Sequence, residues 1–349
     1  MKIVLVLDNI IPTPRYGESE RILWWHSRYL VEAGHDVVLL VRAGSQCKHA
    51  PVVELQRSKP IAQQLPADTA LIHFFRQPTA QMLKGLEKPY LITCFDNATK
   101  ACELDPNTVF LSADHAARHG GSVYVHPGLD FRDYGEMLPD WPRRYFHFLA
   151  EADLPGRNLK DAIALATRAG VHVHIIGSRR IALAPTPRIS LSPYARFHAM
   201  MSREGRNILI NGSRGLLFPV LWHEPFGLPV IESLYLGCPV FGTPFGALPE
   251  LICNKPSPVA GAWSGQVDGC FSDFGCLSVR QSELVDALRH GADAFSPMRC
   301  HQYARERFSA CRMSRQYFQL YEQVLDGQRL HPAPLVVRAP EAPKLRLEP

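Results

Sequence analysis

The 349-residue sequence lacks several features that would assign it to common protein classes. No run of about 18 apolar residues occurs, which excludes a membrane-spanning helix. Neither a P-loop nor a G-x-G-x-x-G pattern is present, which counts against ATP-driven and nicotinamide chemistry. No two of the nine cysteines form a C-x-x-C pair, so we do not expect a zinc site.

In the N-terminal stretch MKIVLVLDNI, Asp8 ends the apolar run, which is therefore too short for the apolar region of a signal peptide. We therefore expect a buried first strand, a cytoplasmic protein and free thiols. Hydrophobic residues make up 46% and charged residues 20% of the chain, as in globular proteins, and the length suits about two domains.

Charge is distributed unevenly along the chain. Residues 1–140 contain 14 Lys and Arg against 16 Asp and Glu, whereas residues 141–349 contain 24 against 17. A basic C-terminal half suits an anionic small ligand. Its arginines are scattered and no nucleic-acid-binding motif accompanies them, so we expect no nucleic-acid partner.

The apolar pattern predicts two successive α/β units. Lys2–Leu7 reads as a strand, 19–33 as a helix and 37–41 as a strand, which is the start of a parallel sheet. After a proline-containing linker at 131–144 the pattern restarts with a strand at 145–149. We predict domains at 1–140 and 141–326, with the last helix able to cross back to the first domain. A loosely packed, proline-rich tail at 327–349 would follow.

Two such units bind ligands at the carboxyl ends of their strands, in the cleft between them. The most informative stretch for such a site lies at 218–233. A strand ends, a loop carries Glu224, and Gly227 and Pro229 begin a helix whose amides and dipole favour phosphate. Glu232 falls in the first turn, where its carboxylate could accept hydrogen bonds from two ribose hydroxyls. The alternative is an ordinary helix start at which the dipole favours acidic residues.

The spacing of Glu224 and Glu232 resembles the E-x7-E pattern of the retaining glycosyltransferases of family 4, which have the GT-B fold. The surrounding run LLFPVLWHEPFGLPVIESLYLGCPVFGT at 216–243 is similar to that family's signature, and especially to the subgroup that reads LFPxxWxEPFGL. Further matching segments are PRYGESER (14–21), GHDV (34–37), HPGLD (126–130), Arg157-Asn158 and Pro249-Glu250. The resemblance covers about residues 2–326, and it implies two Rossmann-like domains with parallel sheets that face each other across a cleft.

The resemblance also implies roles for individual residues. Glu232 would bind the donor ribose, and Glu224 would lie near the donor sugar. Arg157 would neutralise the leaving diphosphate, which makes Glu224 and Arg157 the candidate catalytic pair. The other implied donor-binding residues are Gly17, which lets a loop approach the phosphates, and Phe226, Gly227 and Leu228, whose amides would face the diphosphate or sugar.

Three departures from the family pattern support an alternative function. The family usually has an arginine near positions 151–152, which here are Glu and Ala, and Lys160 or Arg179 could replace it. Phe95 stands where a histidine is common, and Glu18 stands where a second glycine is usual. The alternative is a catalytically inactive nucleotide-sugar-binding or partner protein with the same fold. An epimerase or hydrolase on this fold is a third class, and it would need an acid/base group that we cannot identify.

We therefore expect a retaining hexosyltransferase that uses a nucleotide sugar, with UDP as the leading nucleotide. Its acceptor would be a hydroxyl of a glycan, a lipid-linked saccharide or a small molecule, in polysaccharide, lipopolysaccharide or glycoside synthesis. No metal and no other cofactor is expected, since the donor phosphate can accept the acceptor's proton. His172 and His174 alternate on a predicted strand and are read as a packed pair, not as metal ligands. Relatives dock on membranes, so peripheral contact at the inner membrane face is the one membrane role left open.

Overall fold

The computed structural model describes residues 1–13, 17–149, 155–182, 188–253, 269–337 and 347–348. These residues form two compact units. Of these described residues, those within 1–130 and 308–337 belong to unit 1, and those within 131–253, 269–307 and 347–348 belong to unit 2. The chain passes from unit 1 to unit 2 after Asp130, whereas the sequence pattern placed the change near 140.

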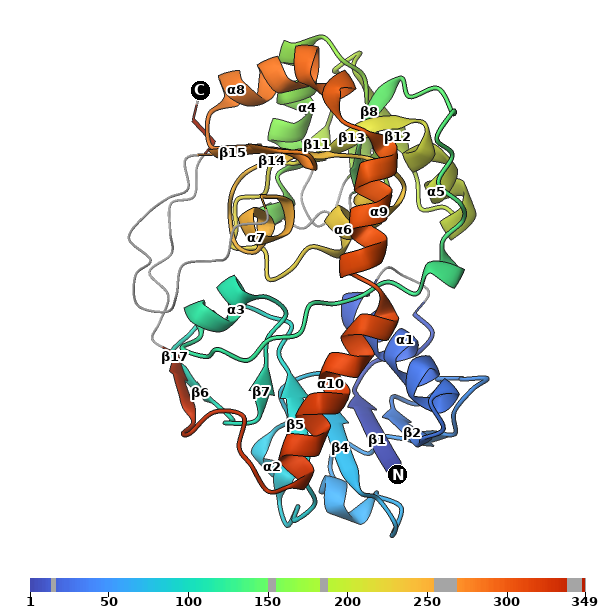
Figure 1. The fold of residues 1–349 in the computed structure, drawn as a ribbon, viewed down its shortest axis with the longest axis vertical. Helices are drawn as coiled ribbons and strands as arrows, with labels where there is room; N and C mark the ends of the chain where they lie inside the picture. Colours follow the sequence, from blue (N-terminus) through green and yellow to red (C-terminus); the bar gives the residue numbers. More distant parts are fainter. Residues whose placement is uncertain (14–16, 150–154, 183–187, 254–268, 338–346, 349) are drawn as a thin grey trace. The chain divides into compact units, whose positions relative to one another are not determined.

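Unit 1 is a parallel α/β sheet with helices on its faces (Figure 1). Its elements are β1 (Lys2–Leu7), α1 (Glu18–Glu32), β2 (Asp36–Val41), β3 (Val52–Glu54), a 3-10 turn (Ile61–Gln63), β4 (Leu71–Phe74), α2 (Ala80–Leu83), β5 (Tyr90–Thr93), β6 (Cys102–Leu104), β7 (Thr108–Val109), α3 (Ala113–Arg118), α10 (Ala310–Leu325) and β17 (Leu335–Val337). The strand order is β3-β2-β1-β4-β5-β7, and every pairing in it is parallel. The order reverses between β1 and β4, as in doubly wound folds.

A buried polar network joins the C-terminal helix α10 to the sheet of unit 1. The Tyr321 hydroxyl lies 2.6 Å from His26 Nε2 and 2.7 Å from His73 Nδ1. His26 Nδ1 also reaches the Ser314 hydroxyl, and His73 Nε2 reaches the Thr93 hydroxyl. Because buried polar groups are costly without partners, this network holds α10 in one position on the sheet.

Part of the proline-rich tail is an ordered strand, whereas the sequence predicted loose packing. Leu335–Val337 form β17, which pairs antiparallel with β6. Leu335 and Val337 are buried beside Phe110 and Leu104, while Val336 between them is exposed. The alternation of apolar side chains is that of a strand with one buried face, and this gain in burial orders a short piece of the tail.

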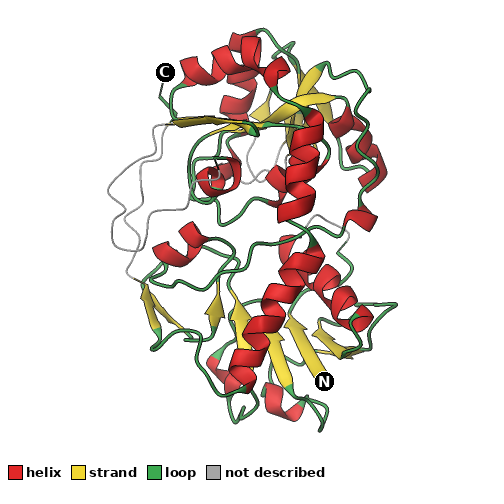
Figure 2. Ribbon diagram, in the orientation of Figure 1, coloured by secondary structure: helices red, strands yellow, loops and turns green. Residues whose placement is uncertain are grey.

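Unit 2 is a second parallel α/β sheet, shown by secondary structure in Figure 2. Its elements are a 3-10 turn (Phe131–Asp133), β8 (Tyr145–Leu149), a 3-10 turn (Pro155–Arg157), α4 (Leu159–Ala169), β9 (Val173–Ile176), β10 (Ile181–Ala182), β11 (Arg188–Ile189), β12 (Ala195–His198), α5 (Arg203–Asn211), β13 (Ser213–Phe218), α6 (Leu228–Tyr235), β14 (Val240–Gly242), α7 (Leu248–Ile252), β15 (Gly269–Ser272), β16 (Gly275–Ser278), α8 (Gln281–Asp286), a π-helical turn (Ala287–Gly291), a 3-10 turn (Ala292–Ala294) and α9 (Pro297–Arg307). The order is β12-β9-β8-β13-β14-β16-β15, and only the β15–β16 pairing is antiparallel among these strands.

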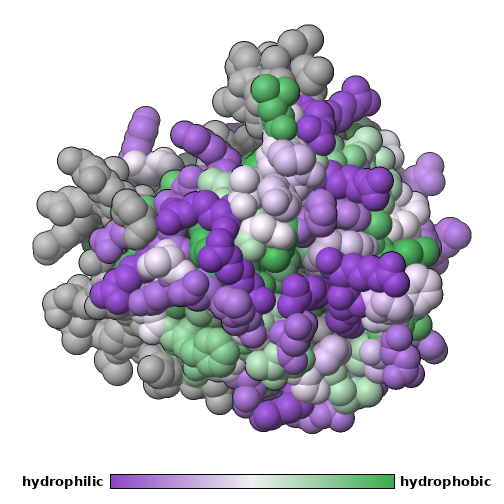
Figure 3. Space-filling model, turned by 90° about the horizontal axis from the view of Figure 1, so that it is seen from above, coloured by the Kyte–Doolittle hydropathy of each residue, from purple (hydrophilic) through white to green (hydrophobic). Residues whose placement is uncertain are grey.

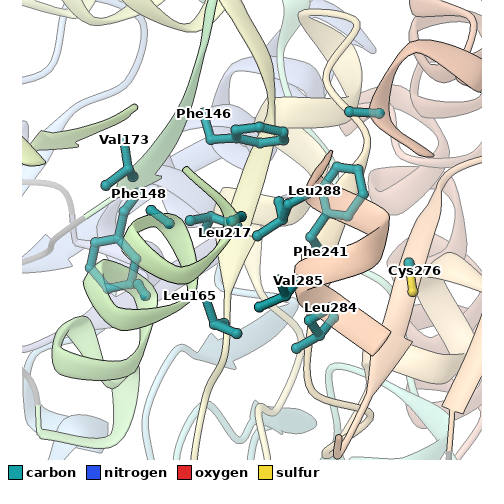
Figure 4. Packing of buried hydrophobic residues seen from close by; sticks show 14 of the residues in the cluster. Phe146, Phe148, Leu165, Val173, Leu217, Phe241, Cys276, Leu284, Val285 and Leu288 are labelled. Atoms are coloured by element: carbon teal, nitrogen blue, oxygen red, sulfur yellow. The ribbon is translucent and has the colours of Figure 1, made fainter. Parts of the chain in front are cut away.

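The core of unit 2 lies between this sheet and the helices α4 and α8 (Figure 4). Phe146 and Phe148 of β8 alternate with polar neighbours, so both point to the same face, where Leu165 of α4 and Leu284 of α8 meet them. The opposite face of β8, β9 and β12 carries histidines and an arginine instead.

One prediction about cysteine is wrong. Cys253, which follows α7, and Cys270 of β15 form a disulfide, with their Cα atoms 6.3 Å apart. Seventeen positions separate the pair, a spacing that carries no sequence signal, and only the packing of α7 near the β15–β16 hairpin brings the two together. The cysteines elsewhere in the described chain are free thiols.

The visible surface agrees with this arrangement of polar and apolar residues. The face in Figure 3 carries mostly hydrophilic side chains, with hydrophobic ones in small separate groups. Of the helices in the described ranges, none has the length and hydrophobicity to cross a membrane.

The network at α10 predicts a pH dependence of stability. Burial lowers the pKa of His26 from 6.5 to about 3, and burial lowers that of His73 well below 6.5. Below pH 6.5 the unfolded chain therefore binds protons that the folded unit does not. These histidines therefore leave the free energy of unfolding unchanged well above pH 6.5, and each lowers it by up to about 1.4 kcal/mol per pH unit as the pH decreases below 6.5.

Urea unfolding between pH 7.5 and 5.0 would measure this effect, because carboxylates with ordinary pKa values remain ionised in that window. We expect the free energy of unfolding to be level above pH 7 and to decrease below 6.5. A free energy that stays constant down to pH 5.0 would contradict the buried, neutral state of these histidines.

Candidate functional site

The candidate site lies in unit 2 at the carboxyl ends of β8 and β13. The strand order reverses between these two strands, since β9 follows β8 on one side and β14 follows β13 on the other. In open α/β sheets the loops diverge at such a point and leave a crevice for ligands. Residues 156–158 follow β8, and residues 219–227 follow β13.

The two loops are bound directly to each other. The Leu221 amide donates to the Gly156 carbonyl at 2.9 Å, and Asn158 Nδ2 donates to the Pro219 carbonyl at 2.9 Å. Gly156 packs on the Trp222 ring, where an added Cβ would lie 3.2 Å from Cγ. The loop after β8 is therefore positioned by the loop after β13.

This docking brings Arg157 to the same edge of the sheet. Arg157 is 4% exposed, and its guanidinium carbon lies 5.4 Å from the centroid of the Phe218 ring at the end of β13. A guanidinium over an aromatic face is attracted by the ring's quadrupole. The side chain thus holds a positive charge at the crevice, where the sequence predicted the neutralisation of a diphosphate.

Glu224 is held by the other loop. Its Oε2 accepts a hydrogen bond from Trp222 Nε1 at 2.9 Å, and its backbone carbonyl accepts one from the Ala247 amide. Gly246 lies against its backbone with φ +70°, and a Cβ there would lie 2.3 Å from the amide nitrogen of Glu224. Only glycine fits this approach. Glu224 is 2% exposed.

Helix α6 begins one residue earlier than the sequence suggested. Leu228 is its first residue, so Pro229 is second; both positions leave an amide without a helical partner, so proline is tolerated at either. Gly227 precedes the helix in the left-handed region, with φ 96°. No side chain caps the first amides among the described residues, and Phe226 and Leu228 are buried. The helix start keeps the features of an anion-binding terminus.

Glu232 on α6 has two partners that the sequence reasoning missed. Its Oε1 accepts a hydrogen bond from the Tyr134 hydroxyl at 2.6 Å, and its Oε2 pairs with Arg206 Nη1 of α5 at 2.9 Å. Both charged side chains are buried, at 1% and 4% exposed. One signal could have indicated Arg206, because it lies one turn before the buried Ile210 on the apolar face of α5.

A buried histidine of β8 contacts Ser233, the next residue of the same helix. His147 Nε2 is 2.9 Å from the Ser233 hydroxyl, and His147 Nδ1 is 2.7 Å from that of Ser213. Burial, together with the positive charges of Arg206 and Arg143, lowers the pKa of His147 to about 3. A neutral imidazole there links α6 to β8 and β13 and is no proton donor at neutral pH.

The other residues that the sequence singled out lie in α4 and in unit 1. Lys160 is exposed in the first turn of α4. Gly17 lies in unit 1 as the N-cap of α1 with φ −78°, and the space of its missing Cβ is occupied by the Glu20 carboxylate, at 2.2 Å. Phe95 stacks on Phe75, with ring centroids 6.3 Å apart. Glu151 lies outside the described residues.

Comparison with known proteins gives structural neighbours alone. No protein-family model matches the sequence, and no curated protein matches it. The fold is similar to that of AviGT4, a glycosyltransferase involved in avilamycin A biosynthesis, with TM-score 0.71, 18% identity and coverage of 96% of this chain and 99% of that one.

Two further similar structures contain nucleotides. The Anabaena protein HepE in complex with UDP and glucose has TM-score 0.62 and 14% identity over 92% of this chain and 99% of its own. The catalytic domain of starch synthase IV from Arabidopsis thaliana, bound to ADP and acarbose, has TM-score 0.66 and 12% identity over 93% and 99%.

The chain has the GT-B fold. The expected fold class is thereby confirmed, and each unit is one of the two Rossmann-like domains of that fold. At these identities the likeness establishes the fold and leaves the roles of Glu224, Glu232, Arg157 and the other site residues as predictions.

The buried Glu232–Arg206 pair predicts a large cost when one partner is removed. Arg206→Met leaves a carboxylate without its charge partner inside unit 2, and we expect a loss of about 3–5 kcal/mol in the free energy of unfolding. The double variant Arg206→Met/Glu232→Leu removes both charges and should be more stable than Arg206→Met alone. Urea unfolding of the three proteins measures this. A double variant less stable than the single one would show that the charges do not act as a pair.

Proposed function

We propose that this protein is a retaining glycosyltransferase that moves a sugar from a nucleotide sugar to a hydroxyl of an acceptor. UDP-linked sugars are the first donors to test, and the acceptor class is a glycan, a lipid-linked saccharide or a small molecule. The observation that carries the proposal is the mutual docking of the loops after β8 and β13, which brings Arg157 and Glu224 to the point where the strand order reverses.

Three independent lines support this reading. The run at 216–243 resembles the signature of family 4 glycosyltransferases, including the E-x7-E spacing of Glu224 and Glu232. The GT-B fold is that of glycosyltransferases whose structures hold UDP with glucose, or ADP. The start of α6 adds amides and a positive dipole end beside Glu224, which suits a diphosphate.

In the proposed reaction the bond between the anomeric carbon and the donor phosphate oxygen breaks, and a bond to the acceptor oxygen forms on the same face. The nucleoside diphosphate leaves with the electron pair, and the acceptor's proton passes to a donor phosphate oxygen. Arg157 and the α6 amides stabilise the charge that develops on the leaving group, which is the main contribution of the protein. Lys160, which is exposed in the first turn of α4, would be the second cation to act on the leaving group.

Glu232 would accept hydrogen bonds from the ribose hydroxyls, and Glu224 would contact the donor sugar. Tyr134 and Arg206 fix the orientation of the Glu232 carboxylate and tie α6 to α5. Binding at a carboxylate already oriented in this way costs less entropy than binding at a free side chain.

Calorimetric titration with UDP, GDP and ADP tests the donor site first. We expect one nucleotide to bind and Glu232→Gln to weaken it by about 10- to 100-fold, since a hydrogen bond to a charged group contributes about 1.5–3 kcal/mol. Arg305→Gln, an exposed change outside the site in the same unit, is the control and should bind normally. Unchanged affinity in Glu232→Gln would remove the ribose contact. No binding of any nucleotide would mean that the fold serves another purpose.

Arg157→Gln tests the catalytic role. We expect kcat to decrease by about 10²- to 10³-fold, because one preorganised positive charge at the leaving group is lost. The measurement is nucleotide release from a panel of nucleotide sugars with hydroxyl acceptors, with the anomeric configuration of the product determined by NMR. Wild-type binding without turnover across the panel would favour the inactive, nucleotide-binding alternative. A product with inverted configuration would refute the retaining mechanism.

A further inference from the structure

A second concave site lies in unit 2 at the edge strand β12 of the sheet. Its lining includes His174 and Arg196, which point away from the apolar core, and also Ala195 and Phe197, which point toward it. The cavity has a volume of about 760 Å³ and is formed along β8, β9 and β12, which are neighbours in the strand order of the sheet. It begins at Arg144 and His172, which precede β8 and β9, and extends to Ser178 and Arg179 after β9. Neither Arg157 nor any residue of 219–232 lines it.

The strand register explains why this face is polar. Phe146 of β8 pairs with Val173 of β9, and both point into the core with α4. The alternate residues therefore point to the opposite face, where His174 of β9 pairs with Arg196 of β12. A sheet buried on both faces would carry apolar side chains at these positions.

Among the described residues, the charged side chains that line the cavity are basic. They are Arg144, Arg179, Arg180 and Arg196, together with His172 and His174, and no described Asp or Glu is among them. Arg180 is used structurally, since its guanidinium donates to the carbonyls of Ser190 and Ala195. Arg144 and Arg196 are exposed, and neither forms a salt bridge with another described residue.

Two histidines of this face, His174 and His198, have lowered pKa values, mainly because they are buried. Burial, followed by the positive charges of His198, Arg196 and His172, lowers the pKa of His174 to about 4. Burial and Arg196 also lower the pKa of His198, whose Nε2 lies 3.2 Å from His174 Nδ1. His174 was expected to form a packed pair with His172, but His172 is exposed and His174 instead stacks on Tyr145. The two rings are 3.6 Å apart and 9° from parallel.

We propose that this cavity binds a small ligand that carries phosphate groups, at a site distinct from the loops after β8 and β13. A guanidinium group can donate two parallel hydrogen bonds to phosphate oxygens and stays charged at every physiological pH, so a cavity lined by several arginines favours such an anion. The stacked Tyr145 and His174 rings provide a flat wall, and the volume lies in the range of sites that hold a sugar phosphate or a nucleotide. The ligand is either a separate phosphorylated compound or a second molecule of the nucleotide that the proposed reaction releases.

Inorganic pyrophosphate is the probe for the first test. Calorimetric titration of the wild-type chain should give binding that the double variant Arg144→Gln/Arg196→Gln weakens at least tenfold. Arg305→Gln removes a positive charge from the same unit outside the cavity and is the matched control, with unchanged affinity expected. Both altered arginines are exposed, and circular dichroism confirms that the variant is folded. Equal affinity in the wild-type chain and the double variant, or no binding to the wild-type chain, would overturn the proposal.

A second measurement reports on the cavity itself. In the labelled protein, NMR titration of the His174 imidazole should show a pKa at least one unit higher with saturating pyrophosphate than without it, because a bound anion favours the imidazolium form. An unchanged His174 pKa despite binding would place the anion elsewhere and overturn the assignment.

Testing a variant of each site for binding at the other site distinguishes the two. Arg157→Gln should keep pyrophosphate binding in the cavity, whereas Arg144→Gln/Arg196→Gln should keep the nucleotide binding that Glu232→Gln weakens. If nucleotide binding is absent from every protein while the cavity still takes pyrophosphate, the proposed transferase function fails and this inference stands. Displacement of pyrophosphate by UDP in Glu232→Gln identifies the nucleotide as the ligand, and its absence identifies a separate phosphorylated compound. Loss of the pyrophosphate signal in Arg157→Gln alone would refute the second site.

Discussion

The hydrogen bond from the Leu221 amide to the Gly156 carbonyl joins the loops that follow two neighbouring parallel strands, and the candidate site depends on it. Parallel strands end at the same edge of a sheet, but at β8 and β13 the connections leave in opposite directions. Without a contact between the loops, the position of Arg157 relative to Glu224 would not be fixed. The hydrogen bond from Asn158 to the Pro219 carbonyl and the packing of the Trp222 ring on Gly156 also hold the two loops together.

Helices in both units are positioned by buried polar groups as well as by apolar packing. In unit 2 the Glu232 carboxylate ties α6 to Arg206 of α5 and to Tyr134. In unit 1 the Tyr321 hydroxyl ties α10 to His26 and His73. Apolar contacts tolerate small shifts of a helix, whereas a buried hydrogen bond is lost when its partners move by about an ångström. These networks therefore select one position for each helix.

The two faces of the sheet in unit 2 have different roles. One face, with Phe146, Phe148 and Val173, packs against α4 and α8 and stabilises the unit. The other face, over β8, β9 and β12, keeps His174 and Arg196 near solvent in a cavity. Four arginines of the basic C-terminal half, namely Arg144, Arg179, Arg180 and Arg196, line this cavity, where we propose that an anion binds.

Local patterns determined most of the elements. The apolar run at Lys2–Leu7, the helical spacing before Gly34 and the restart at Tyr145–Leu149 each depend on neighbours a few residues apart, so the sequence alone predicted them. The segment at 218–233 likewise predicted the start of α6 to within one residue, because a strand, a loop with Gly227 and a helix with Pro229 follow one another there. The resemblance to a known family then supplied the fold, which the structural comparison confirms.

Contacts between distant segments were decided only by the tertiary structure. Arg206 is 26 positions from Glu232, and Tyr134 is 98 positions away, so no local periodicity connects them. The Cys253–Cys270 disulfide, the strand at Leu335–Val337 and the basic cavity have the same origin, because each needs elements that meet after folding. Local patterns fix which face of an element is apolar, whereas the partner of each buried charge is set by how the sheet orders its strands.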